Sequence, residues 1–236
     1  MGAFLIECHV QGRGNELLLP YPVTVLFALF SLAQDPHFWA TIAASLSRIL
    51  VGMIAGTALG CLLAPATSRW IWADRLLSPP IRVIRATPVA SFILLILLWT
   101  HRGVVPAIIA GLMVLPVVWE NLGRGIRETD PLLLEFAKAY RLSRWSTLRL
   151  IYLPSLRPYI LSAVTTSMGL AWKSGVAAEV LCLPRPGIGT QIYNSKLYLE
   201  IPDLFAWTAV VVALSLLLER LLHRLLRWMK GGELHA

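Results

Sequence analysis

Residues 129–158 read TDPLLLEFAKAYRLSRWSTLRLIYLPSLRP, and they form the most charged stretch of an otherwise apolar sequence. Asp130 can cap a helix that begins at Pro131, because aspartate accepts a hydrogen bond from a free N–H and proline has no N–H to lose. Apolar side chains then recur with the period of an α-helix at Leu133, Phe136, Ala137 and Tyr140. Nothing within the stretch covers this stripe, so we expect it to dock against a partner.

The second half of the stretch predicts another short helix. Ser143 is a suitable N-cap, and Pro154 is expected to end the helix. The apolar residues of this helix are Leu148, Ile151 and Tyr152. The whole stretch is therefore expected to form a helix-turn-helix.

The composition is that of a membrane protein. The 236 residues are 57% hydrophobic and 14% charged, and the mean hydropathy is +0.68, which is too apolar for a soluble domain. The net charge of +8 is divided among short loops, as in membrane orientation signals, so no nucleic-acid partner is expected. Cys8, Cys61 and Cys182 lie far apart and predict neither a disulfide framework nor a metal site. The fold class we expect is an all-α polytopic membrane protein.

Five apolar segments are expected to span the lipid bilayer: residues 39–64, 86–99, 104–121, 159–181 and 204–222. Asp203 is expected to cap the last of them. Residues 1–19 hold too short an apolar run to span and lack the features of a signal peptide, and residues 23–33 are expected to lie at the interface. Two connections are expected to be loops, 68–85 and 184–202, the latter with an amphipathic middle.

The first span carries a packing face and one charged residue. Gly52, Gly56 and Gly60 repeat every four residues, a spacing that lets a second helix approach closely in lipid. Arg48 lies in the same span, and two outcomes stay open for it. Its guanidinium either pairs inside the bundle or reaches the outer interface along its own side chain.

The distribution of basic residues predicts the orientation. Residues 67–85, 120–158 and 219–236 hold four, seven and four of the 21 Lys and Arg residues. Because basic loops stay in the cytoplasm, alternate connections are assigned to that side, with the N-terminus outside and the C-terminus inside. The helix-turn-helix, within a loop at 124–158, is therefore expected to be cytoplasmic.

The sequence lacks the motifs of common catalytic sites. It contains no GxxxxGK[ST] phosphate-binding loop, no GxSxG, no HExxH and no clustered His, Asp and Glu set. We therefore expect no enzyme activity and no cofactor, and instead transport driven by a partner chain.

A family resemblance rests on the charged stretch. Its Glu135-Phe136-Ala137, Arg141 and final Ile-Tyr-Leu-Pro resemble the EAA motif of binding-protein-dependent ABC importer permeases, which reads E-A-A, three residues, Gly, nine residues and I-x-L-P, with the spacing kept. The resemblance extends over about 19–202. Three segments are similar to the branch for nitrate, sulfonate, taurine, bicarbonate and thiamine-precursor uptake: SLSRILVGMIAGTALG, RATPVASFILLILLW and the part from AWKSGVAAEVL to GIG.

The resemblance implies a type I ABC importer transmembrane domain that occupies residues 1–236 as a single permease domain. It further implies a homodimer in a prokaryotic inner membrane, a cytoplasmic ABC ATPase dimer that hydrolyses ATP, and an extracytoplasmic solute-binding protein. The solute would be a small anion or organic nutrient, and its identity would depend on the binding protein. The family's first span has no counterpart, so either the start is shortened or this is a five-span version.

The charged stretch would then be the coupling element that enters a groove on the ATPase. The resemblance implies that Phe136, Ala137 and Tyr140 supply contact area and that Glu135 and Arg144 fix the register by charge. Leu142 lies at the break between the two helices. Arg141 replaces the motif's glycine, so either the turn differs or Arg141 is strained.

Candidate solute-pathway residues lie in the segments that line the pore in the family: Thr87, Ser91, Trp119, Asn121, Trp172, Lys173 and Glu179. Trp172 and Glu179 share a helix face, and Lys173 points elsewhere. Glu179 either makes a structural bond or lines the path. Lys173 contacts an anionic substrate, reaches the interface, or pairs with Glu120 or Glu179.

Two other classes of protein are possible readings of such a bundle. An ion-driven secondary transporter would need a paired intramembrane carboxylate, and a lipid-modifying enzyme would need clustered polar groups near an interface. The sequence offers neither arrangement, so the ATP-driven importer is favoured.

Overall fold

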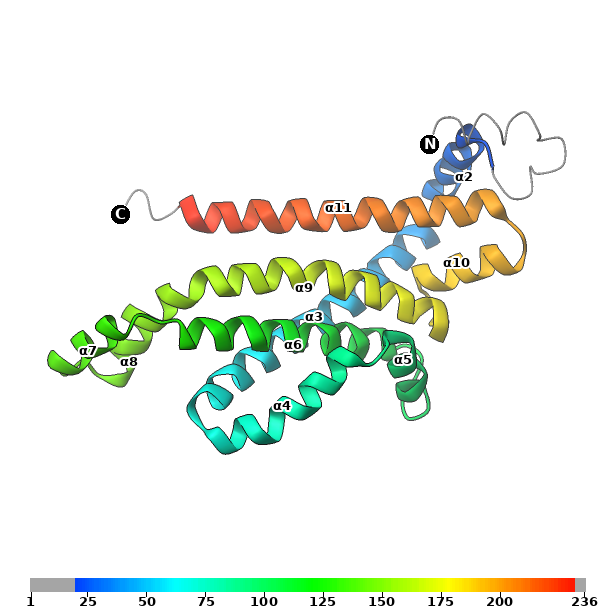
Figure 1. The fold of residues 1–236 in the computed structure, drawn as a ribbon. Coiled ribbons are helices and arrows are strands. Elements are labelled where there is room, and N and C mark those ends of the chain that lie inside the picture. The colour runs from blue at the N-terminus through cyan, green and yellow to red at the C-terminus, as the bar shows by residue number, and fades with distance from the viewer. Residues whose placement is uncertain (1–19, 232–236) are drawn as a thin grey trace, which may run out of the picture.

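The computed structural model describes the backbone of residues 20–231 and the side chains of residues 20–224. Every regular element in this part is helical (Figure 1), which confirms the predicted all-α bundle. The elements are α2 (Pro22–Gln34), α3 (Pro36–Arg69), α4 (Ile71–Ala86), α5 (Val89–Leu97), α6 (Val105–Arg127), α7 (Pro131–Ala139), α8 (Arg144–Thr147), the π-helical turn η1 (Leu148–Tyr152), α9 (Leu153–Cys182), α10 (Ile188–Leu197) and α11 (Ile201–Gly231). The expectations for residues 1–19 lie outside the described residues.

Helix α6 is the centre of the bundle. It packs most extensively on α3 and on α9, and α11 lies beside α9 (Figure 1). Val114 and Val118 of α6 and Ala171 and Trp172 of α9 are all buried in this core. Small helices and turns gather at the end of the bundle that holds α2, α5 and α10, while α7 and α8 extend beyond the opposite end.

The contact between α3 and α6 is unusually close. A Cβ atom added at Gly52 would lie 2.0 Å from the carbonyl oxygen of Ala107, and one at Gly56 would lie 2.3 Å from that of Gly111. Gly60 faces α6 further along the same side. Since no carbon atom fits at such distances, the two backbones meet directly along this glycine face.

Within residues 20–231, three helices are long and apolar enough to cross a membrane: α3, α6 and α11. The pair α4 and α5, bent by 106°, forms a fourth such unit if it is one broken span. Helix α9 is 30 residues long, so it extends about 45 Å, but it is less apolar because it carries several Ser and Thr residues within the bundle. The expected spans 39–64, 104–121 and 204–222 thus lie in α3, α6 and α11, and 86–99 lies mainly in α5 of the bent pair. The expected span 159–181 lies in α9, which is not among these candidate spans.

The expected loop at 68–85 is wrong, because most of it is helix α4. Pro79 and Pro80 lie inside this helix, and Ala73, Ser78 and Ile81 form its buried face. In membrane helices, neighbouring groups can satisfy the backbone that a proline disrupts, so packing outweighs the usual helix-breaking effect.

The expected span 86–99 is also shorter than predicted, since α5 has only nine residues. Pro88 disfavours the α conformation in the residue before it, and Thr87 is accordingly extended, with ψ at 135°. The chain therefore bends sharply between α4 and α5 instead of continuing as one straight helix.

Four further features differ from the sequence expectations. Pro154 does not end its helix, because it lies in the first turn of α9, where the missing N–H costs nothing. The loop expected at 184–202 contains α10. Asp203 is not the cap of α11, because that helix begins at Ile201 and Asp203 falls in its first turn. The expected third span, 104–121, extends to Arg127.

Candidate functional site

The α7–α8 hairpin has the two predicted caps. The side chain of Asp130 accepts a hydrogen bond from the backbone N–H of Leu132 at 2.8 Å, and α7 starts at Pro131. The hydroxyl of Ser143 accepts one from the N–H of Ser146 at 3.1 Å, and α8 follows. Both N-cap predictions are confirmed, and they fix where each helix of the hairpin begins.

The turn between the two helices has the geometry of a glycine turn without the glycine. Arg141 adopts a left-handed conformation, with φ at 50°. The N–H of Leu142 bonds to the carbonyl of Ala137 at 2.9 Å and the N–H of Arg141 to that of Lys138 at 3.1 Å, which is the Schellman pattern of a helix C-terminus. Of the two alternatives for Arg141, the structure therefore shows the strained one. The left-handed conformation costs a residue with a Cβ atom about 1–2 kcal/mol.

The hairpin presents an uncovered apolar surface. The most exposed members are Leu132 at 70%, Phe136 at 52%, Tyr140 at 69% and Trp145 at 71%. The rings of Phe136 and Tyr140 stack at 4.3 Å between centroids, which pre-orders part of the surface. Exposed aromatic groups held in this way are typical of protein-binding surfaces.

The other expected coupling residues lie around this surface. Glu135, Arg141 and Arg144 are exposed, Leu142 is half-buried, and Ala137 is buried within the hairpin. Charged side chains therefore border the aromatic patch, and Ala137 holds the hairpin together instead of offering contact area.

The base of the hairpin is firmly joined to the bundle. The buried hydroxyl of Thr129 donates to the carbonyl of Gly125 at 3.0 Å, and Tyr159 of α9 donates its phenol hydrogen to Glu128. A Cβ at Gly125 would lie 2.7 Å from Cδ2 of Tyr159. A displacement of the hairpin must therefore move the ends of α6 and α9 as well.

A buried charge network lies in the bundle, far along α9 from the hairpin. Glu179 of α9 is fully buried, forms an ion pair with Arg48 of α3, and accepts hydrogen bonds from Ser45 Oγ at 2.8 Å and from the N–H of Gly189 at 3.1 Å. Ser45 in turn accepts a hydrogen bond from the N–H of Ile188 at 2.9 Å, and Arg48 donates to the carbonyl of Pro186 at 2.9 Å. Three side chains, those of Glu179, Arg48 and Ser45, thus tie α3, α9 and the start of α10 together.

This network decides between the alternatives left open for its members. Arg48 pairs inside the bundle, and Glu179 makes a structural bond. Lys173 is exposed and forms no ion pair with either Glu179 or Glu120, which bind arginines instead. Glu179 faces a guanidinium and not a second carboxylate, unlike the pair that an ion-driven transporter would need.

The remaining pathway candidates are not brought together into one site. Thr87 and Asn121 bond to carbonyls of their own helices, and Trp172 is buried with its indole N–H on the carbonyl of Val211 at 3.1 Å. Ser91 is exposed on α5. Trp119 lines a cavity, and its indole N–H donates to the hydroxyl of Thr67 at 2.9 Å.

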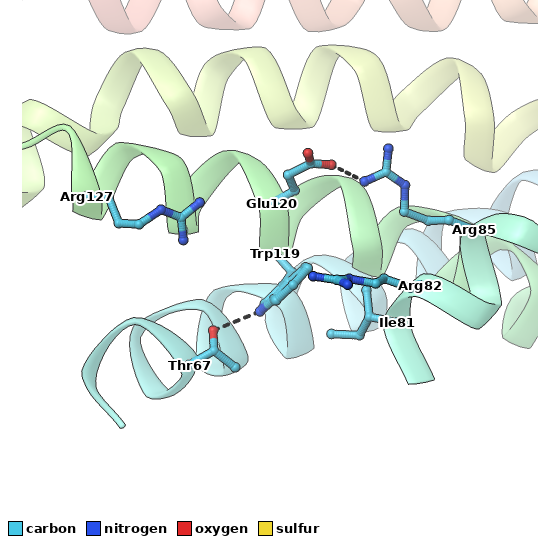
Figure 2. Close-up of a pocket in the computed structure, with 8 residues that line it drawn as sticks. Thr67, Ile81, Arg82, Arg85, Trp119, Glu120 and Arg127 are labelled. Carbon is cyan, nitrogen blue, oxygen red and sulfur yellow. Dashed lines mark hydrogen bonds and ion pairs between the residues drawn. The ribbon is translucent and has the colours of Figure 1, made fainter. Parts of the chain in front are cut away.

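That cavity lies between the end of α3, α4 and α6 (Figure 2) and has a volume of about 190 Å³. Three of its lining residues are arginines, Arg82, Arg85 and Arg127, and one is a carboxylate, Glu120. In the sequence, these arginines indicate only the orientation of the chain in the membrane. A single sequence shows no sign that residues of α4 and α6 meet, because the contact depends on tertiary packing.

Sequence reasoning also missed Trp145 and Ser45. The sequence could have indicated Trp145, because a tryptophan just after the cap Ser143 in a basic loop is expected to be exposed. Ser45 gave none, because a serine in an apolar helix most often bonds to its own backbone.

Residues 56–231 match the family described as "Binding-protein-dependent transport system inner membrane component". The chain is similar to the taurine transport system permease protein TauC of Escherichia coli (strain K12), with 28% identity over 87% of this chain and 76% of the relative. It is also similar to the putative aliphatic sulfonates transport permease protein SsuC of the same organism, with 30% identity over 89% and 82%. The bicarbonate transport system permease protein CmpB of Synechococcus elongatus is 25% identical over 94% and 78%.

Two solved structures share the fold. A crystal structure of an amino acid ABC transporter with histidines superposes with a TM-score of 0.66 and 17% identity, over 84% of this chain and 94% of that one. An inward-facing MetNI methionine ABC transporter gives a TM-score of 0.60 and 17% identity, over 80% and 92%.

Proposed function

The chain belongs to the family of binding-protein-dependent transport system inner membrane components and is the permease subunit of an ABC importer, within which we propose that the α7–α8 hairpin couples an ATPase to the bundle. The permease is not itself an enzyme. It is a multi-pass protein of the inner membrane, and the family implies an ATPase and a binding protein as partners.

One observation carries the proposed role of the hairpin: its aromatic face is uncovered and lies beyond the end of the bundle (Figure 1). A short amphipathic helix binds a partner by laying its apolar face into a groove. Phe136, Tyr140 and Trp145 supply that face, and Glu135 and Arg144 at its border set the register by charge.

The attachment of the hairpin supports a mechanical role. Its base is bonded to α6 and α9 through Thr129 and Tyr159, so a push from an ATPase would reach both helices. The network of Arg48 and Glu179 joins α9 to α3 and α10, so these helices would respond together. Such coupled helix shifts can alternate the access to a site between two sides of a membrane.

We place residues 124–158 and the C-terminus in the cytoplasm. Support comes from Figure 1, in which the C-terminal end of α11 points toward the same end of the bundle as α7 and α8. The basic composition of segments 67–85, 120–158 and 219–236 also supports this assignment, because Lys and Arg residues are enriched in cytoplasmic loops. Two permease chains would form a homodimer, with an ATPase dimer inside and a solute-binding protein outside.

For the solute we propose a small anion or organic nutrient. The relatives are named for taurine, aliphatic sulfonates and bicarbonate, all small molecules that carry an anionic group. Thr87, Ser91 and Lys173 are the accessible pathway candidates, and Lys173 would attract an anion. Trp172 and Glu179 would act through packing.

The experiment is to substitute Phe136→Asp and Glu135→Lys separately and to measure solute uptake and co-purification of the ATPase. Both variants should abolish uptake and weaken co-purification, because a buried charge and a reversed charge oppose docking. Tyr198→Asp is a matched control, since Tyr198 is an aromatic residue with 70% exposure outside the hairpin, and it should keep the ATPase bound. Normal uptake by both hairpin variants would contradict the proposal.

A further inference from the structure

The cavity between α4 and α6 has an excess of positive charge. Arg85 is paired with Glu120, which also lies 3.9 Å from Arg124. Arg82 and Arg127 form no ion pair among the described side chains. Figure 2 shows these two arginines entering the cavity from opposite sides, with Arg82 extending toward Trp119. Both arginines therefore line one cavity without a carboxylate of their own among the described side chains.

Gly123 lines the same cavity next to one of these arginines. A Cβ at this position would be 3.3 Å from Nη1 of Arg127. A larger side chain at position 123 would therefore occupy the space beside this guanidinium.

We propose that this cavity binds the oxyanion group of a small ligand: a sulfonate, carboxylate or phosphate. Arg82 and Arg127 donate paired N–H groups to the oxygens, since a guanidinium fork matches such groups in geometry. Trp119 and Ile81 line the same cavity and accommodate a short apolar remainder.

The volume agrees with such a ligand. A water molecule needs about 10–15 Å³ by the same measure, so about 190 Å³ accommodates a group of several heavy atoms. Two sources share this chemistry: a transported solute, and the phosphate of an anionic lipid. The solute source rests on the proposed importer function and deepens it, whereas binding to the isolated chain does not depend on the hairpin or an ATPase.

The test uses the full-length chain purified in detergent, with two probes. Calorimetric titration with ethanesulfonate at low ionic strength measures binding of a soluble oxyanion, and native mass spectrometry after incubation with phosphatidylglycerol or phosphatidylcholine measures retained lipid. The variant Arg82→Gln/Arg127→Gln should lower the affinity for the probe about tenfold or more, because two charge-assisted contacts are lost.

The matched control is Arg69→Gln/Arg75→Gln, which removes the same charge from exposed arginines on α3 and α4 that do not line the cavity. It should bind like the unmodified chain. Gly123→Leu keeps every charge but fills the part of the cavity beside Arg127, and it should also abolish binding. A thermal melt of each variant shows that the chain is folded.

The outcomes separate the sources. Ethanesulfonate binding that only the cavity variants lose assigns the site to a solute, and selective loss of phosphatidylglycerol assigns it to a lipid. The proposal is overturned if neither probe binds, or if the control variant loses as much probe binding as the cavity variants do. Uptake that fails while ethanesulfonate binding persists would count against the coupling role and not against this site.

Discussion

Arg48 of α3 and Glu179 of α9 form an ion pair inside the bundle, 131 residues apart in the sequence, with the Glu179 side chain fully buried and that of Arg48 15% exposed. Each also bonds to the segment that leads into α10, through Pro186 and Gly189. The pair therefore holds three parts of the chain in register. A buried ion pair is tolerated when further hydrogen bonds satisfy its remaining donors and acceptors, and this pair has such bonds.

Glu179→Ala should destabilise the protein strongly. The substitution leaves the Arg48 guanidinium without a counter-charge in a dry environment, and breaking a buried pair in this way costs about 3–5 kcal/mol. The measurement is the thermal unfolding midpoint of the purified chain in detergent. Removing both charges with Arg48→Met/Glu179→Met should recover part of the loss.

The control for this prediction is Lys173→Ala on the same helix. Lys173 is exposed and outside every described ion pair, so its removal should leave the midpoint nearly unchanged. If Glu179→Ala and Lys173→Ala lower the unfolding midpoint equally, the buried ion pair does not stabilise the fold more than an exposed lysine does.

Gly52→Ala and Gly56→Ala should each destabilise the bundle. The new carbon would overlap backbone atoms of α6, at 2.0 Å from the Ala107 oxygen for Gly52, and α3 would have to move away. Overpacking of this kind typically costs about 1–3 kcal/mol. Gly103→Ala is the control, because nothing lies within 4 Å of its added Cβ. Unfolding midpoints that agree among all three variants would contradict the direct contact of α3 and α6.

Arg141→Gly should keep uptake and stabilise the hairpin by about 1 kcal/mol, since glycine adopts the left-handed conformation without strain. Arg141→Val should weaken it, because a β-branched side chain is poorly tolerated at positive φ. Hydrogen exchange of the amides of Arg141 and Leu142 reports on the turn directly. Faster exchange of these amides in Arg141→Gly than in Arg141→Val would contradict the conclusion that the left-handed conformation strains Arg141.

Gly125→Ala should separate docking from coupling. The added carbon would lie 2.7 Å from the ring of Tyr159 and force the base of the hairpin apart, while the aromatic face stays intact. We expect ATPase co-purification to persist and uptake to fall. Gly169→Ala on α9, where the nearest atom is 3.9 Å away, should leave both unchanged. Loss of ATPase binding in Gly125→Ala would show that the base is part of the docking surface.

Local chemistry made the hairpin predictable. Asp130 and Ser143 announce helix starts because their side chains bond to amides two or three residues away, and this requires no knowledge of the rest of the fold. The left-handed turn at Arg141 was harder, since the sequence carries arginine where such a turn favours glycine. Its conformation is set by the two helices that it joins.

The elements that depended on packing were predicted poorly. Residues 68–85 were expected to form a loop, but the buried face of α4 against its neighbours keeps most of this stretch helical, even across Pro79 and Pro80. The partners of Glu179 could not be identified, because Ser45 and Arg48 lie more than 100 residues away. The arginine-lined cavity was missed for the same reason.

The most direct test of the coupling role is site-specific photo-crosslinking with a photoreactive amino acid at position 136 in the assembled transporter. We expect a crosslink to the ATPase from position 136 and none from position 198, an equally accessible aromatic site outside the hairpin. The yield at 136 should also change when ATP is added, because the ATPase moves while the hairpin stays docked. A crosslink from 136 to another permease segment, with none to the ATPase, would contradict the central claim.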